Sequence, residues 1–379
     1  MGNPSYIPIG STLGMIAGGQ IGGFFTEAAL RMGYKVSIWD PDINAPAKRL
    51  ATQSFTGEFN DNKVKSEFEK SISALSIEWE NVPSNLIKSL EKNIPVKPSS
   101  KSLSLAQDRI KEKTFLSKNK FPVTEHLGIK SIRDANKVSF GFPWIVKTAT
   151  LGYDGHGQWH IKNIDDIAAL KSNTNSMIVE KVVEYKCELS VLIAMDDNEN
   201  LIAYPPTENI HANGILKMSI SPARIANEIK DKAINLASDV IKTIGDPGVF
   251  CVEMFLTKTD ALLVNEIAPR PHNSGHHTID AFSISQYEHQ VRILTGLPIR
   301  TPIMTSKSVL LNILGDEFTN LTNNKNLTEV LRSLDAKLYL YGKITVRPGR
   351  KMGHVLFCGT SRTDLIKQAK FCQALISSQ

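Results

Sequence analysis

The chain has 379 residues, of which 41% are apolar and 22% are charged, and its formal net charge is +6. These proportions are typical of a globular enzyme with two or three domains, and no apolar run reaches the about 18 residues that a transmembrane helix needs. Because the lysines and arginines form no basic blocks, the charge suits phosphorylated small molecules as well as nucleic acid, and we expect neither a nucleic-acid nor a membrane partner.

The N-terminal segment predicts a βαβ unit. An apolar strand over residues 13–17 leads into the glycine loop GGQIGG (18–23), a helix over 21–32 and a second strand over 35–39 that ends at Asp40. Such a helix N-terminus offers unpaired N–H groups to an anion. The pattern AxGxxG followed by an acid is an imperfect dinucleotide fingerprint. A nicotinamide-dependent dehydrogenase is therefore an alternative, although nothing downstream resembles hydride chemistry.

A change of composition marks the next boundary. Glu80 lies in SIEWENVP, a strand end limited by a proline, and residues 97–101 (KPSSK) are rich in proline, serine and lysine, which is typical of a domain boundary. Residues 104–119 then predict one helix that carries Arg109.

A glycine-rich loop follows the next strand. Residues 142–147 (FPWIVK) end at Lys147 and run into GYDGHGQ over 152–158. Three glycines in so short a segment favour a loop that folds over a ligand and presents backbone N–H groups to an anion. A further apolar strand, 177–183 (MIVEKVV), contains Glu180 and is followed by Glu188, and His211 lies in the loop TENIHANG.

Two apolar runs, 249–256 and 261–267, joined by a polar turn predict a β-hairpin. If Thr259 and Asp260 lie at the centre of the turn, Glu253 faces Glu266 across the pair. Like charges placed that way destabilise a sheet, so we expect a cation between them. Carboxylates on rigid strands suit Mg²⁺, which completes its coordination with water and phosphate oxygens. Glu253 and Glu266 are the predicted metal ligands.

The loop after this hairpin is crowded with polar side chains. Arg270, His272, Asn273, Ser274 and His276 lie within seven residues, between prolines and beside a glycine. A loop of this composition is more typical of a site than of a connection. Zinc binding by the histidines 272, 276 and 277 is an alternative that we disfavour, because the loop contains no acidic or cysteine ligands at metal-binding spacing.

The C-terminal segment predicts a small sheet. An apolar strand over 309–314 and a helix near 327–334 precede a hairpin of residues 337–346 and 353–357 that turns at RPGRKM. This turn brings Lys343, Arg347, Arg350 and Lys351 together. A charged sheet edge that guards against aggregation is the alternative interpretation.

The segment NEIAPRPHNSGHHT (265–278) resembles the signature of the ATP-grasp enzymes that carboxylate aminoimidazole ribonucleotide, and the resemblance extends over about residues 13–357. It implies an α/β fold in three parts: a Rossmann-like pre-ATP-grasp domain (1–100), a two-lobed ATP-grasp domain (101–300) and a small β-rich C-terminal domain (301–379). It also implies a homodimer.

The same resemblance implies a reaction. Magnesium ATP would phosphorylate bicarbonate to carboxyphosphate, whose carboxyl group is then transferred to the exocyclic amine of 5-aminoimidazole ribonucleotide. A sister ATP-grasp ligase that activates formate or another carboxylate remains an alternative.

The resemblance assigns roles to individual residues. Bicarbonate and its reactive phosphate would be oriented by Arg270, His272, Asn273, Ser274 and Lys343. ATP would be contacted by Arg109, Lys147, the loop residues Gly152, Tyr153, Asp154, Gly155, His156, Gly157 and Gln158, the adenine segment Glu180, Lys181, Val182 and Val183, and by Glu188, His211, Asn265 and Glu266. The ribonucleotide would be contacted by Gly19, Gln20, Ile21, Glu80, Tyr153, Asp154, His156, Lys343 and Arg350.

Two departures from the family pattern are visible. Gly23 and Phe24 stand where an Arg-Met pair commonly follows the glycine loop, and His156 stands where Arg or Lys is more frequent. A neutral histidine would weaken a phosphate contact at that position. The four cysteines are scattered without a CxxC pair, which favours a reducing, cytoplasmic environment.

Overall fold

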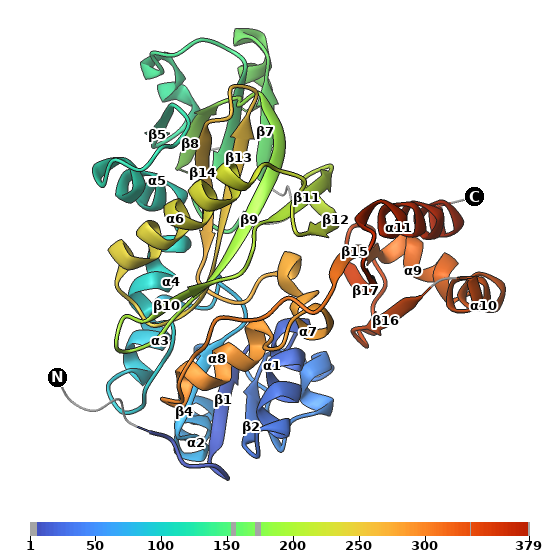
Figure 1. The fold of residues 1–379 in the computed structure, drawn as a ribbon. Helices are drawn as coiled ribbons and strands as arrows, with labels where there is room; N and C mark the ends of the chain where they lie inside the picture. The colour runs from blue at the N-terminus through green and yellow to red at the C-terminus, as the bar shows by residue number, and fades with distance from the viewer. Residues whose placement is uncertain (1–5, 153–156, 171–175, 334, 378–379) are drawn as a thin grey trace.

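The protein is described by a computed structural model that covers residues 6–152, 157–170, 176–333 and 335–377 (Figure 1). An N-terminal α/β part lies at the bottom of the view, a tall central part rises above it, and the C-terminal part projects to one side. The predicted α/β class is confirmed. Within the described segments, no helix combines the length and apolarity that crossing a bilayer requires.

The N-terminal part is a parallel sheet with the strand order β3-β2-β1-β4. The predicted βαβ unit is present as β1, α1 and β2. Consecutive residues of both strands are buried, so both faces of the sheet are covered. Its elements are β1 (Thr12–Ile16), α1 (Gln20–Arg31), β2 (Lys35–Trp39), η1 (Pro46–Arg49), β3 (Gln53–Phe55), α2 (Asn62–Ser71), β4 (Ala74–Ile77), α3 (Ser84–Leu90) and α4 (Ser100–Ala106).

The predicted helix over 104–119 is two helices. The first ends at Ala106. Asp108 caps the second, because its carboxylate accepts the backbone N–H groups of Ile110 and Lys111 at 3.0 and 3.2 Å. Arg109 is therefore the first residue of α5 (Arg109–Lys118).

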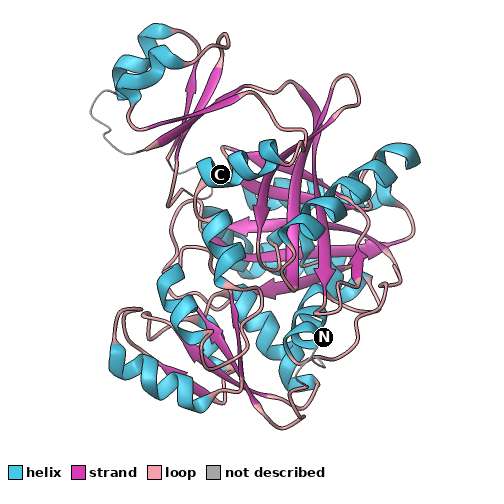
Figure 2. Cartoon of the chain, turned by 90° about the vertical axis from the view of Figure 1, so that its left-hand side faces the viewer, coloured by secondary structure: helices cyan, strands magenta, loops and turns pink. Residues whose placement is uncertain are grey.

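A small antiparallel lobe follows, with the order β5-β8-β6-β7, and it stands at the top of the molecule in both views (Figure 1, Figure 2). The glycine loop connects β6 to β7 of this lobe in the sequence. The elements are β5 (His126–Ile129), η2 (Ile132–Lys137), β6 (Trp144–Thr148), β7 (Gln158–Ile161), η3 (Ile164–Leu170) and β8 (Met177–Lys181).

The large sheet has the order β14-β13-β9-β11-β12-β15-β17-β16, with β10 beside β9. The helix α6 covers one face of it. Its elements up to residue 294 are β9 (Tyr185–Met195), β10 (Leu201–Ala203), β11 (Thr207–Ala212), β12 (Ile215–Ser221), α6 (Asn227–Ile244), β13 (Gly248–Thr257), β14 (Leu262–Ala268), η4 (Asn273–Gly275), α7 (Thr278–Ala281) and α8 (Gln286–Leu294).

The C-terminal strands extend this sheet, whereas the sequence predicted a small sheet of their own. The pairing of Met218 with Leu311 joins β12 to β15, so the open edge of β12 is satisfied by the next strand. The elements are β15 (Lys307–Leu314), α9 (Gly315–Thr322), α10 (Asn324–Ser333), β16 (Ala336–Leu340), β17 (Lys351–Gly359) and α11 (Arg362–Ser377). Residues 341–350 form a longer connection than the predicted hairpin turn.

The predicted pairing of Glu253 with Glu266 is confirmed, but the turn differs from the prediction. The turn is centred on Thr259, with Asp260 in the left-handed region at φ 62°, which is typical of a three-residue hairpin loop. That register alone would place Asn265 opposite Glu253. A bulge at Asn265 shifts the pairing by one position and brings Glu266 opposite Glu253 instead.

We predict opposite effects for two glycine substitutions. Gly245 ends α6 at φ 62°, where an added Cβ costs about 1–2 kcal/mol, so Gly245→Ala should lower the urea midpoint. Gly23 lies inside α1, and a Cβ there meets no atom within 4 Å, so Gly23→Ala should raise the midpoint by relieving the about 0.5–1 kcal/mol cost of a helical glycine. Equal shifts of the two variants in one direction would contradict this account.

Candidate functional site

Glu253 and Glu266 face each other at the centre of the molecule, where the loop after β14 begins. Burial and the charge of Glu266 raise the pKa of Glu253 to about 8. A pair of hard oxygen ligands that repel each other in this way fits a divalent cation such as Mg²⁺, which would remove the repulsion. The residues present therefore suit the metal that the resemblance implies.

A buried hydrogen-bond chain leads to Glu253. Asn209 Nδ2 donates to Ser190 Oγ at 3.0 Å, Ser190 Oγ is 2.8 Å from Ser274 Oγ, and Ser274 Oγ is 2.8 Å from His272 Nδ1. The backbone N–H of Ser274 also donates to His272 Nδ1, so that nitrogen is an acceptor. His272 Nε2 therefore carries the hydrogen and directs it at Glu253 Oε1, 3.1 Å away.

Lys147 lies on β6 beside a buried acid. Its Nζ is 2.5 Å from Glu180 Oε2, while Lys113 Nζ is 3.1 Å from Glu180 Oε1. Burial alone would raise the pKa of Glu180, but the two lysines outweigh it and lower the pKa to about 2. Lys113 also donates to the carbonyl oxygen of Asn265 at 2.6 Å. One lysine thus links the lobe that carries Lys147 to the bulge that positions Glu266.

A second buried residue of α5 holds the other side of the bulge. Glu112 accepts the backbone N–H of Ile267 at 2.6 Å, and burial together with the charge of Glu266 raises the pKa of Glu112 to about 8. The sequence analysis missed Glu112 and Lys113 because a charged pair on a short helix is normally solvated. The available signal was their helical spacing from Leu116, which places all three on one buried face.

Two predicted ATP contacts lie together on the neighbouring strands. His211 forms an ion pair with Glu188, whose other oxygen accepts the Tyr185 hydroxyl at 2.8 Å. Although burial alone would lower it, the pKa of His211 is raised by Glu188. Lys147 is also close enough to lower the pKa of Glu188. These contacts place Glu188 and His211 near Lys147.

The adenine segment connects β8 to β9. Glu180 is buried between its lysines, whereas Lys181 is exposed and pairs with Glu125. The backbone N–H of Lys181 donates to the Glu125 carbonyl oxygen, and that of Val182 to the Pro143 carbonyl oxygen. Val183 continues the connection at the surface of the lobe.

The glycine loop is described only at its two ends. Arg109 donates to the carbonyl oxygens of Thr148 and Gly152 at 3.1 and 3.0 Å, so its guanidinium holds the base of the loop. Gly157 lies at φ 72°, where a Cβ would meet the Thr148 hydroxyl, and Gln158 pairs with Lys147 across β6 and β7. The predicted contacts Tyr153, Asp154, Gly155 and His156 lie outside the described residues.

Arg270 and Asn273 lie on the polar loop. Arg270 forms a partly buried ion pair with Glu80. Burial alone would lower the pKa of the Arg270 guanidinium, but Glu80 raises it, and the group stays charged. Asn273 is buried, and both polar atoms of its side chain lack a hydrogen-bond partner among the described residues. An amide left in that state is typical of a position that meets a ligand.

The N-terminal glycine loop differs from the prediction. The backbone N–H groups of Ile21 and Gly22 are not open to an anion, because Glu78 accepts both at 3.1 and 3.0 Å. Asp40 accepts the N–H of Gly18 at 2.7 Å. A dinucleotide would need these groups for its phosphates and ribose, so the geometry does not support the dehydrogenase alternative.

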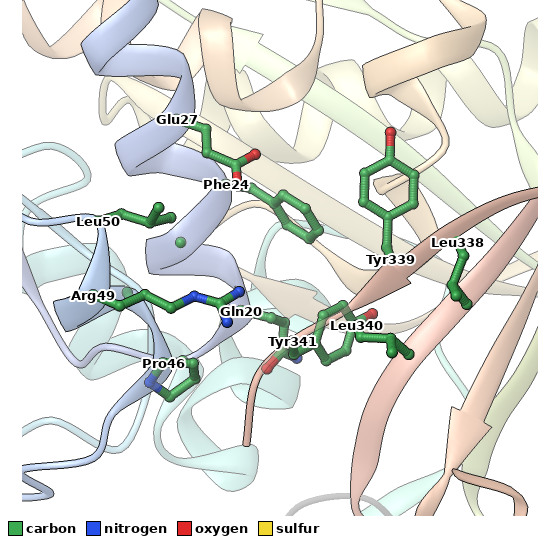
Figure 3. Close-up of a pocket in the computed structure, with 13 residues that line it drawn as sticks. Gln20, Phe24, Glu27, Pro46, Arg49, Leu50, Leu338, Tyr339, Leu340 and Tyr341 are labelled. Carbon is green, nitrogen blue, oxygen red and sulfur yellow. The ribbon is translucent and has the colours of Figure 1, made fainter. Parts of the chain in front are cut away.

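Gly19 and Gln20 line a cavity of about 160 Å³ between α1 and β16 (Figure 3). Figure 3 shows Phe24, Arg49 and Tyr341 around the same space. The position of Gly23, where the family commonly has arginine, is one wall of this cavity, and Arg49 supplies a cation to it.

The loop between β16 and β17 carries the predicted cations. Lys343 Nζ lies 5.5 Å from the centre of the Tyr341 ring and donates to the Lys351 carbonyl oxygen at 2.8 Å. Its charge acts on the buried Glu78. Arg350 donates to the Thr345 carbonyl oxygen at 2.7 Å. Burial and the nearby charge of Arg347 both lower the pKa of Arg350.

The three loop histidines point to different partners. His276 contacts the Tyr287 hydroxyl at 2.6 Å, and His277 contacts the Ser274 carbonyl oxygen at 2.7 Å, whereas His272 faces Glu253. The structure therefore does not support a zinc site made of these three histidines.

We predict that Lys113→Met destabilises the protein by about 3–5 kcal/mol, because it leaves Glu180 buried with one lysine fewer. Lys111→Met on the same helix removes only an exposed lysine 3.9 Å from Asp108 and should cost about 0–1 kcal/mol. Urea denaturation of both variants measures the difference. If Lys113→Met were no more harmful than Lys111→Met, the buried pair would not support the lobe.

Three family models match consecutive parts of the chain. The ribonucleotide synthetase preATP-grasp domain matches residues 11–107, the ATP-grasp domain matches 114–287, and the phosphoribosylaminoimidazole carboxylase C-terminal domain matches 308–368. Together they cover most of the described fold.

The chain is also similar over nearly its whole length to individual proteins. The N5-carboxyaminoimidazole ribonucleotide synthase of Bacillus subtilis is 34% identical over 364 residues, 95% of this chain and 94% of that relative. A crystal structure of an N5-carboxyaminoimidazole ribonucleotide synthetase with ADP is 33% identical, with a TM-score of 0.93 over 97% of this chain and 98% of that one. The Aspergillus clavatus enzyme with ADP and 5-aminoimidazole ribonucleotide is 28% identical, with a TM-score of 0.90 over 97% and 99%. The chain therefore belongs to the N5-carboxyaminoimidazole ribonucleotide synthase family of ATP-grasp ligases.

Proposed function

We propose that the chain carboxylates the exocyclic amine of 5-aminoimidazole ribonucleotide, using ATP and bicarbonate, in purine biosynthesis. Carboxyphosphate is the intermediate, and the products are N5-carboxyaminoimidazole ribonucleotide, ADP and phosphate. The observation that carries the proposal is the opposed pair Glu253 and Glu266 beside the loop of Arg270, His272 and Asn273. Its family supports the same reaction, since the related Aspergillus clavatus structure holds both ADP and the ribonucleotide.

Glu253 and Glu266 would hold Mg²⁺, which supplies charge neutralisation at the β- and γ-phosphates of ATP when it is bound. The bulge at Asn265 aims the second carboxylate, and His272 orients the first through its Nε2 hydrogen. Both carboxylates are therefore fixed before ATP arrives, which reduces the reorganisation that phosphoryl transfer requires.

Lys147 would lie beneath the phosphates of ATP. Glu180 holds its ammonium at one end of the strand, and because Lys113 also contacts Glu180, the acid stays ionised. The ionised Glu180 holds the Lys147 ammonium in place, so a fixed positive charge is available as the terminal phosphoryl group leaves. Arg109 holds the base of the glycine loop, which would exclude water from carboxyphosphate.

Bicarbonate would bind beside the metal carboxylates. Arg270 offers a permanently charged guanidinium held by Glu80, and guanidinium groups match carboxylate-like oxygens with paired hydrogen bonds. Asn273 offers an amide whose buried atoms have no described partner, while Ser274 holds His272 in place. We assign these residues to the orientation of bicarbonate and its phosphorylated form.

The ribonucleotide would lie between the N-terminal glycine loop and the β16–β17 connection. Gly19 and Gln20 line the cavity there, and Lys343 and Arg350 would bind the phosphate of the substrate with charge-assisted hydrogen bonds. Lys343 faces the buried Glu78, which would orient its ammonium.

A formate-activating ligase remains the second candidate, because formate offers the same carboxylate oxygens to Arg270.

We also propose domain boundaries, an oligomeric state and a cellular location for the chain. The domain boundaries lie near residues 100 and 300, close to the ends of the matched family models. The chain acts as a homodimer, as its resemblance to the family implies. It works in the reducing cytoplasm, which is consistent with its four free cysteines.

We expect Glu266→Gln to abolish the production of ADP in the presence of bicarbonate and the ribonucleotide, because one ligand of the metal loses its charge. The matched control is Glu184→Gln, which alters an exposed acid paired with Lys258. Such a pair contributes only about 0–1 kcal/mol to the stability of the fold, so this variant should keep at least half of the wild-type rate. Wild-type turnover in Glu266→Gln would remove the metal argument.

Lys343→Ala should raise the KM for the ribonucleotide about tenfold or more with little change in the KM for ATP, since a charge-assisted hydrogen bond contributes about 1.5–3 kcal/mol. Lys367→Ala on α11 removes an exposed lysine and serves as the control. Initial rates at varied ribonucleotide concentration measure the effect, and an unchanged KM would place the phosphate elsewhere.

Production of ADP with each acid separates the two candidate reactions. We expect turnover with bicarbonate and the ribonucleotide and only background turnover when formate replaces bicarbonate. Faster turnover with formate would favour the second candidate.

A further inference from the structure

Cys251 lies beside the carboxylate pair and plays no part in the proposed reaction. It precedes Glu253 by two residues on β13, so the two side chains leave the strand on the same face. Cys251 is fully buried, and Glu253 and His272 retain 13% and 14% side-chain exposure. The sulfur, one carboxylate oxygen and one imidazole nitrogen lie within 4.8 Å of one another. Among the described residues, three metal-ligating groups therefore converge at this point.

The three groups suit a transition metal and not magnesium. Thiolate and imidazole select zinc and similar ions, whereas magnesium takes oxygen ligands. The distance of 3.1 Å between His272 Nε2 and Glu253 Oε1 is close to the about 3.3 Å that two ligands at 2.0–2.1 Å subtend in a tetrahedral zinc site. Zinc binds a thiolate sulfur at about 2.3 Å, so binding would draw the Cys251 sulfur toward the other two ligand atoms.

The surroundings already support a coordinated histidine. Once Nε2 binds a metal, the ring hydrogen lies on Nδ1 and donates to Ser274 Oγ, 2.8 Å away, in place of the hydrogen bond that Nδ1 accepts from the Ser274 backbone N–H in the free protein. Partners of this kind fix the tautomer of ligating histidines. The same Ser274 hydroxyl reaches the Cys251 thiol, where it would stabilise a thiolate.

The polar loop alone contains no acidic or cysteine ligand for zinc, which is the objection to a zinc site there. The fold supplies both missing ligand types from β13, about twenty residues earlier, and so removes the objection for His272 while leaving His276 and His277 outside the cluster.

We propose that Cys251, Glu253 and His272 form an inhibitory site for a divalent transition metal such as Zn²⁺. The metal binds through the thiolate of Cys251, one oxygen of Glu253 and Nε2 of His272, and water fills the fourth position. Because Glu253 is shared, the bound ion removes a carboxylate from the site proposed for Mg²⁺ and displaces the hydrogen bond that orients it. Occupancy of this site by the transition metal therefore inhibits the production of ADP.

The binding step is balanced without a redox partner. The thiol of Cys251 and, where it is protonated, the carboxyl of Glu253 each lose one proton to solvent, the ring hydrogen of His272 moves from Nε2 to Nδ1, and the metal keeps its charge. The ion replaces the proton of the Cys251 thiol, since metal binding releases the protons that its ligands carry. The inhibitory consequence rests on the proposed function, whereas the binding itself does not.

Binding is tested with Co²⁺ as a spectroscopic probe on the full chain without nucleotide. The wild type should bind one ion with a thiolate-to-cobalt absorption band, and added Zn²⁺ should remove the band by displacement. Cys251→Ser should lose the band, whereas Cys358→Ser, which alters a thiol on β17, should keep it. A wild type without the band, or a Cys251→Ser variant that retains it, overturns the site. Cys251→Ala repeats the test if the serine variant does not fold.

Inhibition is tested by ADP production at varied Zn²⁺, expressed for each variant as the ratio of rates with and without the ion. Half-inhibition of Cys251→Ser should require at least about tenfold more Zn²⁺ than the wild type or Cys358→Ser requires. Raised magnesium ATP should shift the wild-type curve to higher Zn²⁺, because both ions use Glu253. Equal sensitivity of the wild type and Cys251→Ser overturns the inhibitory role.

The two measurements separate this inference from the proposed function. A cobalt band that depends on Cys251, in a protein without ADP production from bicarbonate and the ribonucleotide, upholds the metal site and refutes the function. ADP production without such a band does the reverse.

Discussion

Glu253 and Glu266 are held opposite each other on paired strands, and two carboxylates so placed repel each other unless a cation lies between them. The strands do not relieve this repulsion, since the bulge at Asn265 is what brings the second acid into line with the first. Burial adds to it, because the charged form of Glu253 is poorly solvated. The fold thus maintains an electrostatic conflict at its centre, and a bound divalent ion is the simplest resolution.

The rest of the site is arranged around that pair. The helix α5 grips the bulge from both sides through Glu112 and Lys113, and Lys113 continues to Glu180 and so to the phosphate-end Lys147. From the opposite side, the polar chain through Ser274 orients His272 toward Glu253. Helix α5 and the small lobe are thus joined to the carboxylate pair through buried, charged contacts, which are costly to break singly.

The sequence was sufficient for features set by local pattern and insufficient for those set by packing. The βαβ unit and the pairing of Glu253 with Glu266 follow from the pattern of apolar residues. The pairing was predicted correctly only because the bulge at Asn265 compensates for a turn centred half a residue earlier than predicted. The anion site expected at α1 failed because a carboxylate from β4's end, Glu78, occupies its N–H groups. The approach of Cys251 to His272 was not visible, since it depends on how the loop folds back over β13.

The most direct test of the central claim is the position of the metal in crystals grown with Mn²⁺ and ADP, located by the anomalous scattering of manganese. The account predicts a peak between Glu253 and Glu266, in contact with an oxygen of each and with the nucleotide phosphates. A nucleotide bound in the site with the metal contacting neither carboxylate, or with the two carboxylates turned apart, would contradict it.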